Sequence, residues 1–168
     1  MEALQNKVAA SGLITLDLEK FYPETAIIPF DLKDFLFMEM LLKEKEFRIS
    51  LDEHDWSQYD GKLVAVFCST DAIIPLWAYM LVSAKLSPHA KRVHAGDAAS
   101  FSRELFLQNI RSGINPVDFE GKRVVIKGCG DKPIPEYAYM EASLILLPVV
   151  RSLMYGEPCS TVPVFKQK

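Results

Sequence analysis

The sequence predicts an α/β protein: a single domain of 168 residues with a largely parallel sheet, built from two duplicated βαβ units and preceded by an N-terminal strand and helix. Two observations carry this prediction. Residues 59–100 and 119–160 resemble each other at a separation of about 60 residues. Each stretch also reads as strand, helix and strand, and a crossover of that length implies parallel pairing with a right-handed connection.

The duplication can be followed along both stretches. Each opens on Gly-Lys, continues through a cysteine to Ile-Pro and Ala-Tyr-Met, and closes on a glycine and a serine. The matching strings are Gly61-Lys62 with Gly121-Lys122, Ile74-Pro75 with Ile134-Pro135, Ala78-Tyr79-Met80 with Ala138-Tyr139-Met140, and Gly96 and Ser100 with Gly156 and Ser160. This alignment needs a one-residue insertion before Cys129, compensated before Ile134. Two copies are too few for a solenoid, so we interpret them as a duplicated unit within one domain.

The N-terminal elements are predicted from residues 13–48. The β-branched content of residues 13–18 predicts a strand that Pro23 ends. Asp31 has the character of a helix N-cap, and the apolar stripe after it, with basic residues near residue 48, predicts a helix over this stretch. Residues 53–61 are polar and turn-rich and form the predicted connection into the first copy.

Within the copies, continuous apolar runs predict buried parallel strands at residues 63–67 and 123–127. Helices are predicted over 76–86 and 135–147, because Pro75 and Pro135 are tolerated in a first helical turn. Shorter strands follow at 92–96 and 152–156, and an amphipathic helix at about 100–111 joins the copies. Residues 161–165 are interrupted by Pro163 and predict an edge strand or a clamp.

Composition limits the function classes. Hydrophobic residues make up 49% and charged residues 24%, which is ordinary for a globular protein. A net charge of −3 with both signs interspersed argues against nucleic acid as a partner. No apolar run reaches the roughly 18 residues that span a bilayer. Residues 1–7 lack a signal pattern, and three cysteines fit a reducing compartment, so a cytoplasmic protein is expected, with a homodimer as the default assembly.

The three cysteines are the strongest functional signal. Cys68 and Cys129 each follow the first strand of a copy, and Cys159 follows the last predicted strand. If the four strands share one parallel sheet, all three thiols lie at its carboxyl edge, where open α/β sheets place their sites.

Carboxylates accompany the cysteines. An aspartate stands two or three residues after each of the first two, and a histidine between two acids precedes the first copy. Thiolate and carboxylate together suit iron or zinc, or three ligands of an iron–sulfur cluster. The predicted metal-site residues are therefore Cys68, Cys129, Cys159, Asp71, Asp131 and His54.

Two alternatives stay open, because no Cys-X-X-Cys spacing is present. One is a thiol-dependent enzyme with a cysteine nucleophile and an acid or His54 as its partner. The other is a non-catalytic interaction module whose cysteines are structural, since free cysteine often behaves as a small buried hydrophobe. Ser100 and Ser160 are better explained as caps than as nucleophiles, and His54 is more often a surface or capping residue than a ligand.

Several strings of this sequence resemble a bacterial family described as domain of unknown function 2480 (DUF2480), found mostly in Bacteroidota. The resemblance rests on residues 54–59 (HDWSQY), 68–75 (CSTDAIIP), 77–80 (WAYM), 126–129 (IKGC) and 154–160 (MYGEPCS). It implies no established activity. Through gene neighbourhoods of the sulfur-mobilisation (SUF) system it implies a role near iron, sulfur or clusters, with iron–sulfur assembly proteins as partners. Family members carry Gly-Glu-Ala-Cys where this chain has Pro158 before Cys159.

Overall fold

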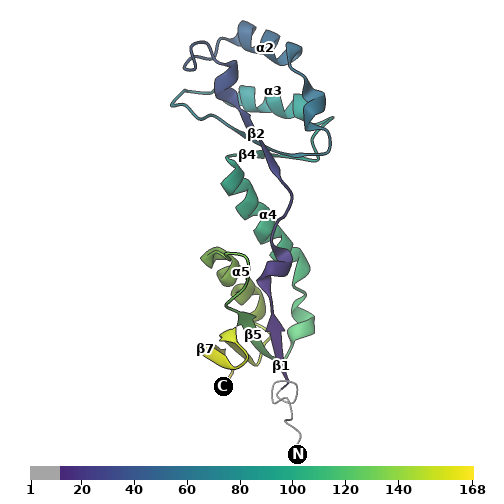
Figure 1. The fold of residues 1–168 in the computed structure, drawn as a ribbon, viewed down its shortest axis with the longest axis vertical. Coiled ribbons are helices and arrows are strands. Elements are labelled where there is room, and N and C mark those ends of the chain that lie inside the picture. Colours follow the sequence, from purple (N-terminus) through teal and green to yellow (C-terminus); the bar gives the residue numbers. More distant parts are fainter. Residues whose placement is uncertain (1–11) are drawn as a thin grey trace, which may run out of the picture. The chain divides into compact units, whose positions relative to one another are not determined.

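The computed structural model of the protein describes residues 12–168 and contains two sheets (Figure 1). Residues 1–7, on which the expectation of no export signal rests, lie outside the described part. Contacts divide the chain into two compact units, which are described separately. Unit 1 comprises Met1–Pro23 and Leu105–Lys168, and unit 2 comprises Glu24–Glu104.

Unit 2 is built on a parallel sheet in the order β2-β3-β4. Val82 of the helix α3, Leu51 of α2 and Val64 of β3 are fully buried in one core. Ala78, Val82 and Leu86 follow the spacing of a helix face, so α3 covers the sheet with one side. Along the chain the elements are β2 (Ile27–Asp31), the 3-10 helix η2 (Leu32–Phe35), α2 (Glu44–Glu53), η3 (Trp56–Tyr59), β3 (Leu63–Phe67), α3 (Leu76–Leu86), β4 (Arg92–Ala95) and the start of α4 (Ala98–Gly113).

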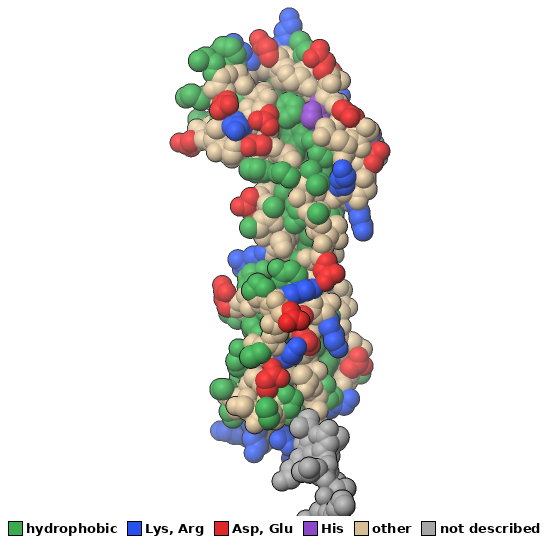
Figure 2. Space-filling model, viewed as in Figure 1, with side chains coloured by type: hydrophobic (Ala, Val, Ile, Leu, Met, Phe, Trp, Pro, Cys, Tyr) green, Lys and Arg blue, Asp and Glu red, His purple; other side chains and the backbone are tan. Residues whose placement is uncertain are grey.

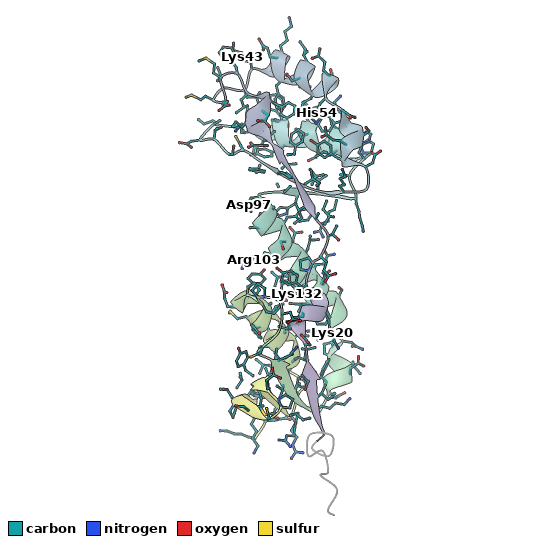
Figure 3. The ribbon with its side chains drawn as sticks, viewed as in Figure 1. Lys20, Lys43, His54, Asp97, Arg103 and Lys132 are labelled. Carbon is teal, nitrogen blue, oxygen red and sulfur yellow. The ribbon has the colours of Figure 1, made fainter. Side chains whose placement is uncertain are left out.

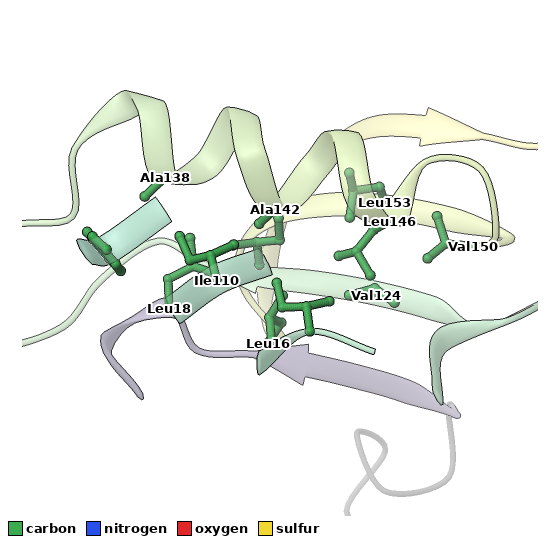
Figure 4. Packing of buried hydrophobic residues seen from close by; sticks show 12 residues of the cluster. Leu16, Leu18, Ile110, Val124, Ala138, Ala142, Leu146, Val150 and Leu153 are labelled. Atoms are coloured by element: carbon green, nitrogen blue, oxygen red, sulfur yellow. The ribbon is translucent and has the colours of Figure 1, made fainter. Parts of the chain in front are cut away.

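Unit 1 contains a four-stranded sheet in the order β1-β5-β6-β7, in which only β7 is antiparallel. In its core, Ala142 and Leu146 pack with Val124 and Leu153 (Figure 4). The elements are β1 (Leu13–Leu16), η1 (Leu18–Phe21), the rest of α4, η4 (Pro116–Phe119), β5 (Arg123–Lys127), α5 (Glu136–Leu146), β6 (Ser152–Glu157) and β7 (Ser160–Lys166).

The α/β class and both predicted βαβ units are confirmed, as β3-α3-β4 and β5-α5-β6. The prediction that the four strands share one sheet is wrong. The first strand of each copy already has two neighbours: β3 lies between β2 and β4, and β5 lies between β1 and β6. Neither of these two central strands pairs with a strand of the other copy, and the hydrogen-bonded strands form two separate sheets.

The predicted N-terminal helix from Asp31 to about residue 48 is also wrong. Residues 27–31 form β2, where Ile28 lies opposite Val64 and Phe30 opposite Val66. Asp31 does cap a helix, since its Oδ1 accepts the Lys33 amide at 3.0 Å, but that helix is the short η2. The longer helix, α2, begins only at Glu44.

The two copies align without the predicted insertion. Phe67 ends β3 and Lys127 ends β5, and the loops from there to Pro75 and Pro135 have the same length. Cys68 therefore corresponds to Gly128, and Cys129 corresponds to Ser69. A Cβ at position 128 would lie 2.7 Å from the Tyr155 ring, so the ring occupies the space that a side chain at this position would need.

The duplication also extends beyond the two predicted stretches. β1 with η1 and β2 with η2 share the string Asp-Leu-x-x-Phe, at residues 17–21 and 31–35. In each copy this strand pairs in parallel with the first strand of the βαβ unit. Unit 2 is thus inserted into unit 1, between η1 and the C-terminal part of α4.

The surface agrees with the charge pattern of the sequence. Figure 2 shows acidic and basic side chains interspersed over the visible face, without a basic stripe. Within residues 12–168, no helix has the length and apolar character required to cross a membrane.

Candidate functional site

A pocket of about 350 Å³ lies in unit 1, beyond the carboxyl ends of β1 and β5. Open α/β sheets place ligand sites at this edge, and the volume falls within the range of small-molecule sites. The lining side chains come from η1, from the loop after β5, from α5 and from β6. They are Asp17, Leu18, Glu19, Lys127, Gly128, Cys129, Gly130, Lys132, Pro133, Ile134, Tyr139 and Tyr155.

An ion pair joins the ends of β1 and β5. Lys127 Nζ lies 3.0 Å from Asp17 Oδ2, and Asp17 Oδ1 accepts the Glu19 amide at 3.0 Å. Burial on its own would raise the pKa of Asp17, but the hydrogen bonds from Lys127 and Glu19 outweigh it and hold the pKa below its ordinary value. The hydrogen bond that Lys127 donates to Asp17 raises the pKa of Lys127, and the negative charges of Glu19 and Glu157 add to this. Three carboxylates therefore act on one ammonium group.

Glu19 holds the loop after β5, which carries Cys129, close to η1. Its Oε1 accepts the backbone N–H of Lys132 at 3.1 Å. A Cβ at Gly130 would fall 1.5 Å from the same oxygen, so only glycine lets the loop approach the carboxylate this closely. Lys132, labelled in Figure 3, places its Nζ 5.2 Å from the centroid of the Tyr22 ring.

Two tyrosines form the opposite wall. Tyr139 donates its hydroxyl to the Lys127 carbonyl at 3.2 Å, and Tyr155 donates to the Gly128 carbonyl at 3.4 Å. The rings meet edge to face with centroids 5.5 Å apart. Burial raises the pKa of Tyr139, and the nearby acidic groups, Cys129 among them, raise it further. The hydroxyl therefore stays protonated and acts as a donor at neutral pH.

One carboxylate near the pocket has an unsatisfied atom. Glu157 is the last residue of β6, and its buried Oε1 has no hydrogen-bond partner among the described residues. A buried acceptor without a partner costs free energy, so this oxygen is suited to a donor or a cation that the protein itself does not provide.

The three predicted cysteines fall into two groups. Cys129 lines the pocket, and Cys159 is exposed in the hairpin between β6 and β7, at the same edge of the unit 1 sheet. Cys68 belongs to unit 2, where its Sγ lies 3.4 Å from Thr70 Oγ1. The condition under which all three thiols would reach the edge of one sheet is therefore not met, because the copies form separate sheets.

His54 lies in an aromatic cluster of unit 2 rather than among acids. Its ring meets Phe35 and Trp56 edge to face, with centroids 5.3 and 4.9 Å away, and Nε2 lies 3.1 Å from Tyr59 Oη. Burial lowers the pKa of His54, and the charge of Asp55 only partly opposes this. His54, labelled in Figure 3, therefore has the environment of a packed neutral imidazole.

The remaining predicted ligands, Asp71 and Asp131, are exposed. Among residues 12–168, no three His, Cys, Asp or Glu side chains lie close enough together to form a ready-made metal site. Sequence reasoning missed Asp17, Glu19 and Lys127 as site residues. The signal that could have found Lys127 is its difference from Phe67, the corresponding residue of the other copy.

Comparison with known proteins gives a match to a family model. Searches of the curated proteins and of the solved structures found no match to this chain. The family model described as "Protein of unknown function (DUF2480)" matches residues 2–167, which is nearly the whole sequence. The chain therefore belongs to the DUF2480 family, as its cysteine-containing strings predict.

Proposed function

We propose that this protein is a binding or accessory protein whose unit 1 pocket takes a small cation, in the first instance iron or zinc. The observation that carries the proposal is the presence of carboxylates beside the Cys129 thiol. Lys127 is already paired with Asp17, which leaves the Glu19 and Glu157 carboxylates and the thiol to meet a cation. Thiolate with carboxylate is a ligand set that borderline divalent metals accept.

Binding requires the loop after β5 to adjust, since the described residues contain no ready-made set of three ligands. Gly128 and Gly130 flank Cys129, and glycine gives a loop the backbone freedom for such an adjustment. Cys159 leaves the adjacent strand at the same edge and is the nearest candidate for a second thiolate along the sheet. The proposal includes iron–sulfur assembly proteins as the partners that would supply or receive the metal.

The test uses Co²⁺, whose bonds to thiolate sulfur give a charge-transfer absorption band. Full-length protein is reduced, freed of metal and titrated with Co²⁺ without oxygen. We expect the band in the wild type, its loss in Cys129→Ser and its weakening in Cys159→Ser. Cys68→Ser is the matched control, because this thiol belongs to the other copy, and it should leave the band unchanged. A band that survives Cys129→Ser, or that never forms, would overturn the proposal.

A further inference from the structure

Three side chains of unit 2 form a hydrogen-bonded chain that the pocket in unit 1 does not involve. His94, in β4, places Nε2 3.0 Å from Ser100 Oγ and Nδ1 2.8 Å from Glu104 Oε2. Ser100 and Glu104 lie in the first two turns of α4, which begins just after Asp97 (labelled in Figure 3). A hydroxyl, an imidazole and a carboxylate in this order are the parts of a nucleophile, its base and the group that orients the base.

The hydrogen bonds fix the protonation of the imidazole. An ionised carboxylate only accepts, so in the neutral ring Nδ1 carries the proton and donates it to Glu104. Nε2 then presents its lone pair to Ser100 Oγ, as a general base requires. Arg92 forms an ion pair with the other Glu104 oxygen and holds the carboxylate in place.

Packing keeps the base in position while the hydroxyl stays accessible. The His94 ring stacks on the fully buried Phe101 with centroids 4.8 Å apart, and its side chain is only 15% exposed. Ser100 is exposed. A Cβ at Gly96 would lie 2.5 Å from Ser100 Oγ and 2.8 Å from His94 Nε2, so only glycine lets the backbone pack this closely against the pair.

The contact between Ser100 and His94 is not explained by helix capping alone, and it is not repeated in the other copy. Ser100 does take part in capping, since its N–H donates to Asp97 Oδ1 at 2.8 Å. Its Oγ lies 2.8 Å from the Asp97 carbonyl oxygen and 3.0 Å from His94 Nε2, so its single hydroxyl proton can be donated to either acceptor by rotation about the C–O bond. Ser160 holds the corresponding position in unit 1, but Met154 stands where unit 2 has His94. The base is therefore specific to unit 2.

We propose that Ser100, His94 and Glu104 form an acyl-transfer site for a small carboxylic ester. Ser100 Oγ bonds to the carbonyl carbon while its proton passes to His94 Nε2. The bond from that carbon to the leaving oxygen then breaks, and His94 returns the proton to this oxygen. Water repeats the sequence: its oxygen bonds to the carbon, the bond to Oγ breaks, Ser100 regains a proton and the free acid leaves.

The first experiment labels the full-length protein with a fluorophosphonate, from which an activated serine oxygen displaces fluoride, and locates the adduct by peptide mass spectrometry. We expect an adduct on Ser100 and none on Ser160, which serves as the internal control. His94→Gln should slow labelling by about 100-fold, the usual contribution of a general base. Labelling of Ser100 no faster than that of Ser160, or a rate that does not depend on His94, would overturn the proposal.

A second variant tests whether Glu104 orients and strengthens the His94 base or only supports the local structure. Glu104→Gln keeps a hydrogen-bond acceptor for His94 but removes the charge, so the imidazole becomes a weaker base. The pH midpoint of the labelling rate should then move to lower pH, while the circular dichroism spectrum stays that of the wild type. An unmoved midpoint would remove Glu104 from the site. Asp97 and Arg92, the other charged groups beside His94, are left intact.

Discussion

Gly128 shows how one residue separates the two copies. Its counterpart is Cys68, and the ring that closes over Gly128 belongs to Tyr155, whose counterpart in β4 is the small Ala95. Unit 2 thus has the larger side chain on the loop, whereas unit 1 has the larger side chain, the Tyr155 ring, on the strand. This ring forms part of the pocket wall in unit 1. The loop of unit 2 carries its cysteine at a different position from Cys129.

Gly128→Ala should therefore destabilise the protein. The new methyl group meets the Tyr155 ring at 2.7 Å, and forced overpacking costs about 1–3 kcal/mol. In a Tyr155→Ala background the same change should cost much less, because the obstructing ring is gone. Urea unfolding of the four proteins in this cycle measures the coupling. Equal costs in both backgrounds would show that the ring does not limit position 128.

His54 makes the stability of unit 2 depend on pH. Its pKa in the folded protein lies below the ordinary 6.5, because burial disfavours the imidazolium. The unfolded chain therefore binds a proton more readily, so stability is fully present above pH 6.5 and falls as the pH drops through the folded pKa. Asp17 and Asp31 titrate in a lower window, since their pKa values lie below 3.8.

Urea unfolding between pH 7.5 and pH 5 tests this dependence, a range set by the ordinary histidine pKa. The free energy of unfolding should decrease over the range in the wild type. His54→Gln, which cannot gain a proton, should show a flatter profile. If both proteins lose the same stability, another group titrates.

At the scale of elements, the sequence predicted the duplicated parts closely. Strands at residues 63–67 and 123–127 and the helix at 76–86 have the predicted bounds. Their signals are local: continuous apolar runs and a proline before each helix. The missed strand β2 has no such signal, because Pro29 interrupts it and the Asp31 cap resembles the start of a long helix. Pairing along β3 decides its conformation, and pairing cannot be read from a local pattern.

The site was predicted only in part, for the same reason. Cys129 was found from its place after a strand, and it does line a pocket at the carboxyl edge. Its neighbour Lys127 meets Asp17, a partner 110 residues away along the chain, only because β1 lies beside β5. The strand order decides which side chains meet. The sequence therefore predicted that the site lies at the carboxyl edge of a sheet, but not all the residues that line it.

At the scale of the molecule, the duplication is nested. One copy, residues 24–104, interrupts the other, and each has its own sheet and its own core. The two clusters of buried hydrophobic residues share no member. Because the two cores are separate, we expect each copy to be a cooperative unit that can unfold independently of the other.

Leu86 and Leu146 allow a matched test of that independence. They hold the same position in α3 and α5, and both are fully buried. Replacing a buried leucine by alanine costs about 2–5 kcal/mol, because the cavity left behind only partly closes. Leu86→Ala should therefore speed native-state hydrogen exchange at the amides of β3 while those of β5 keep the wild-type rate, and Leu146→Ala should do the reverse. Mass spectrometry of peptides covering the two strands separates the outcomes. Equal acceleration of both strands in either variant would mean that the nested copies open as one cooperative unit, despite their separate cores.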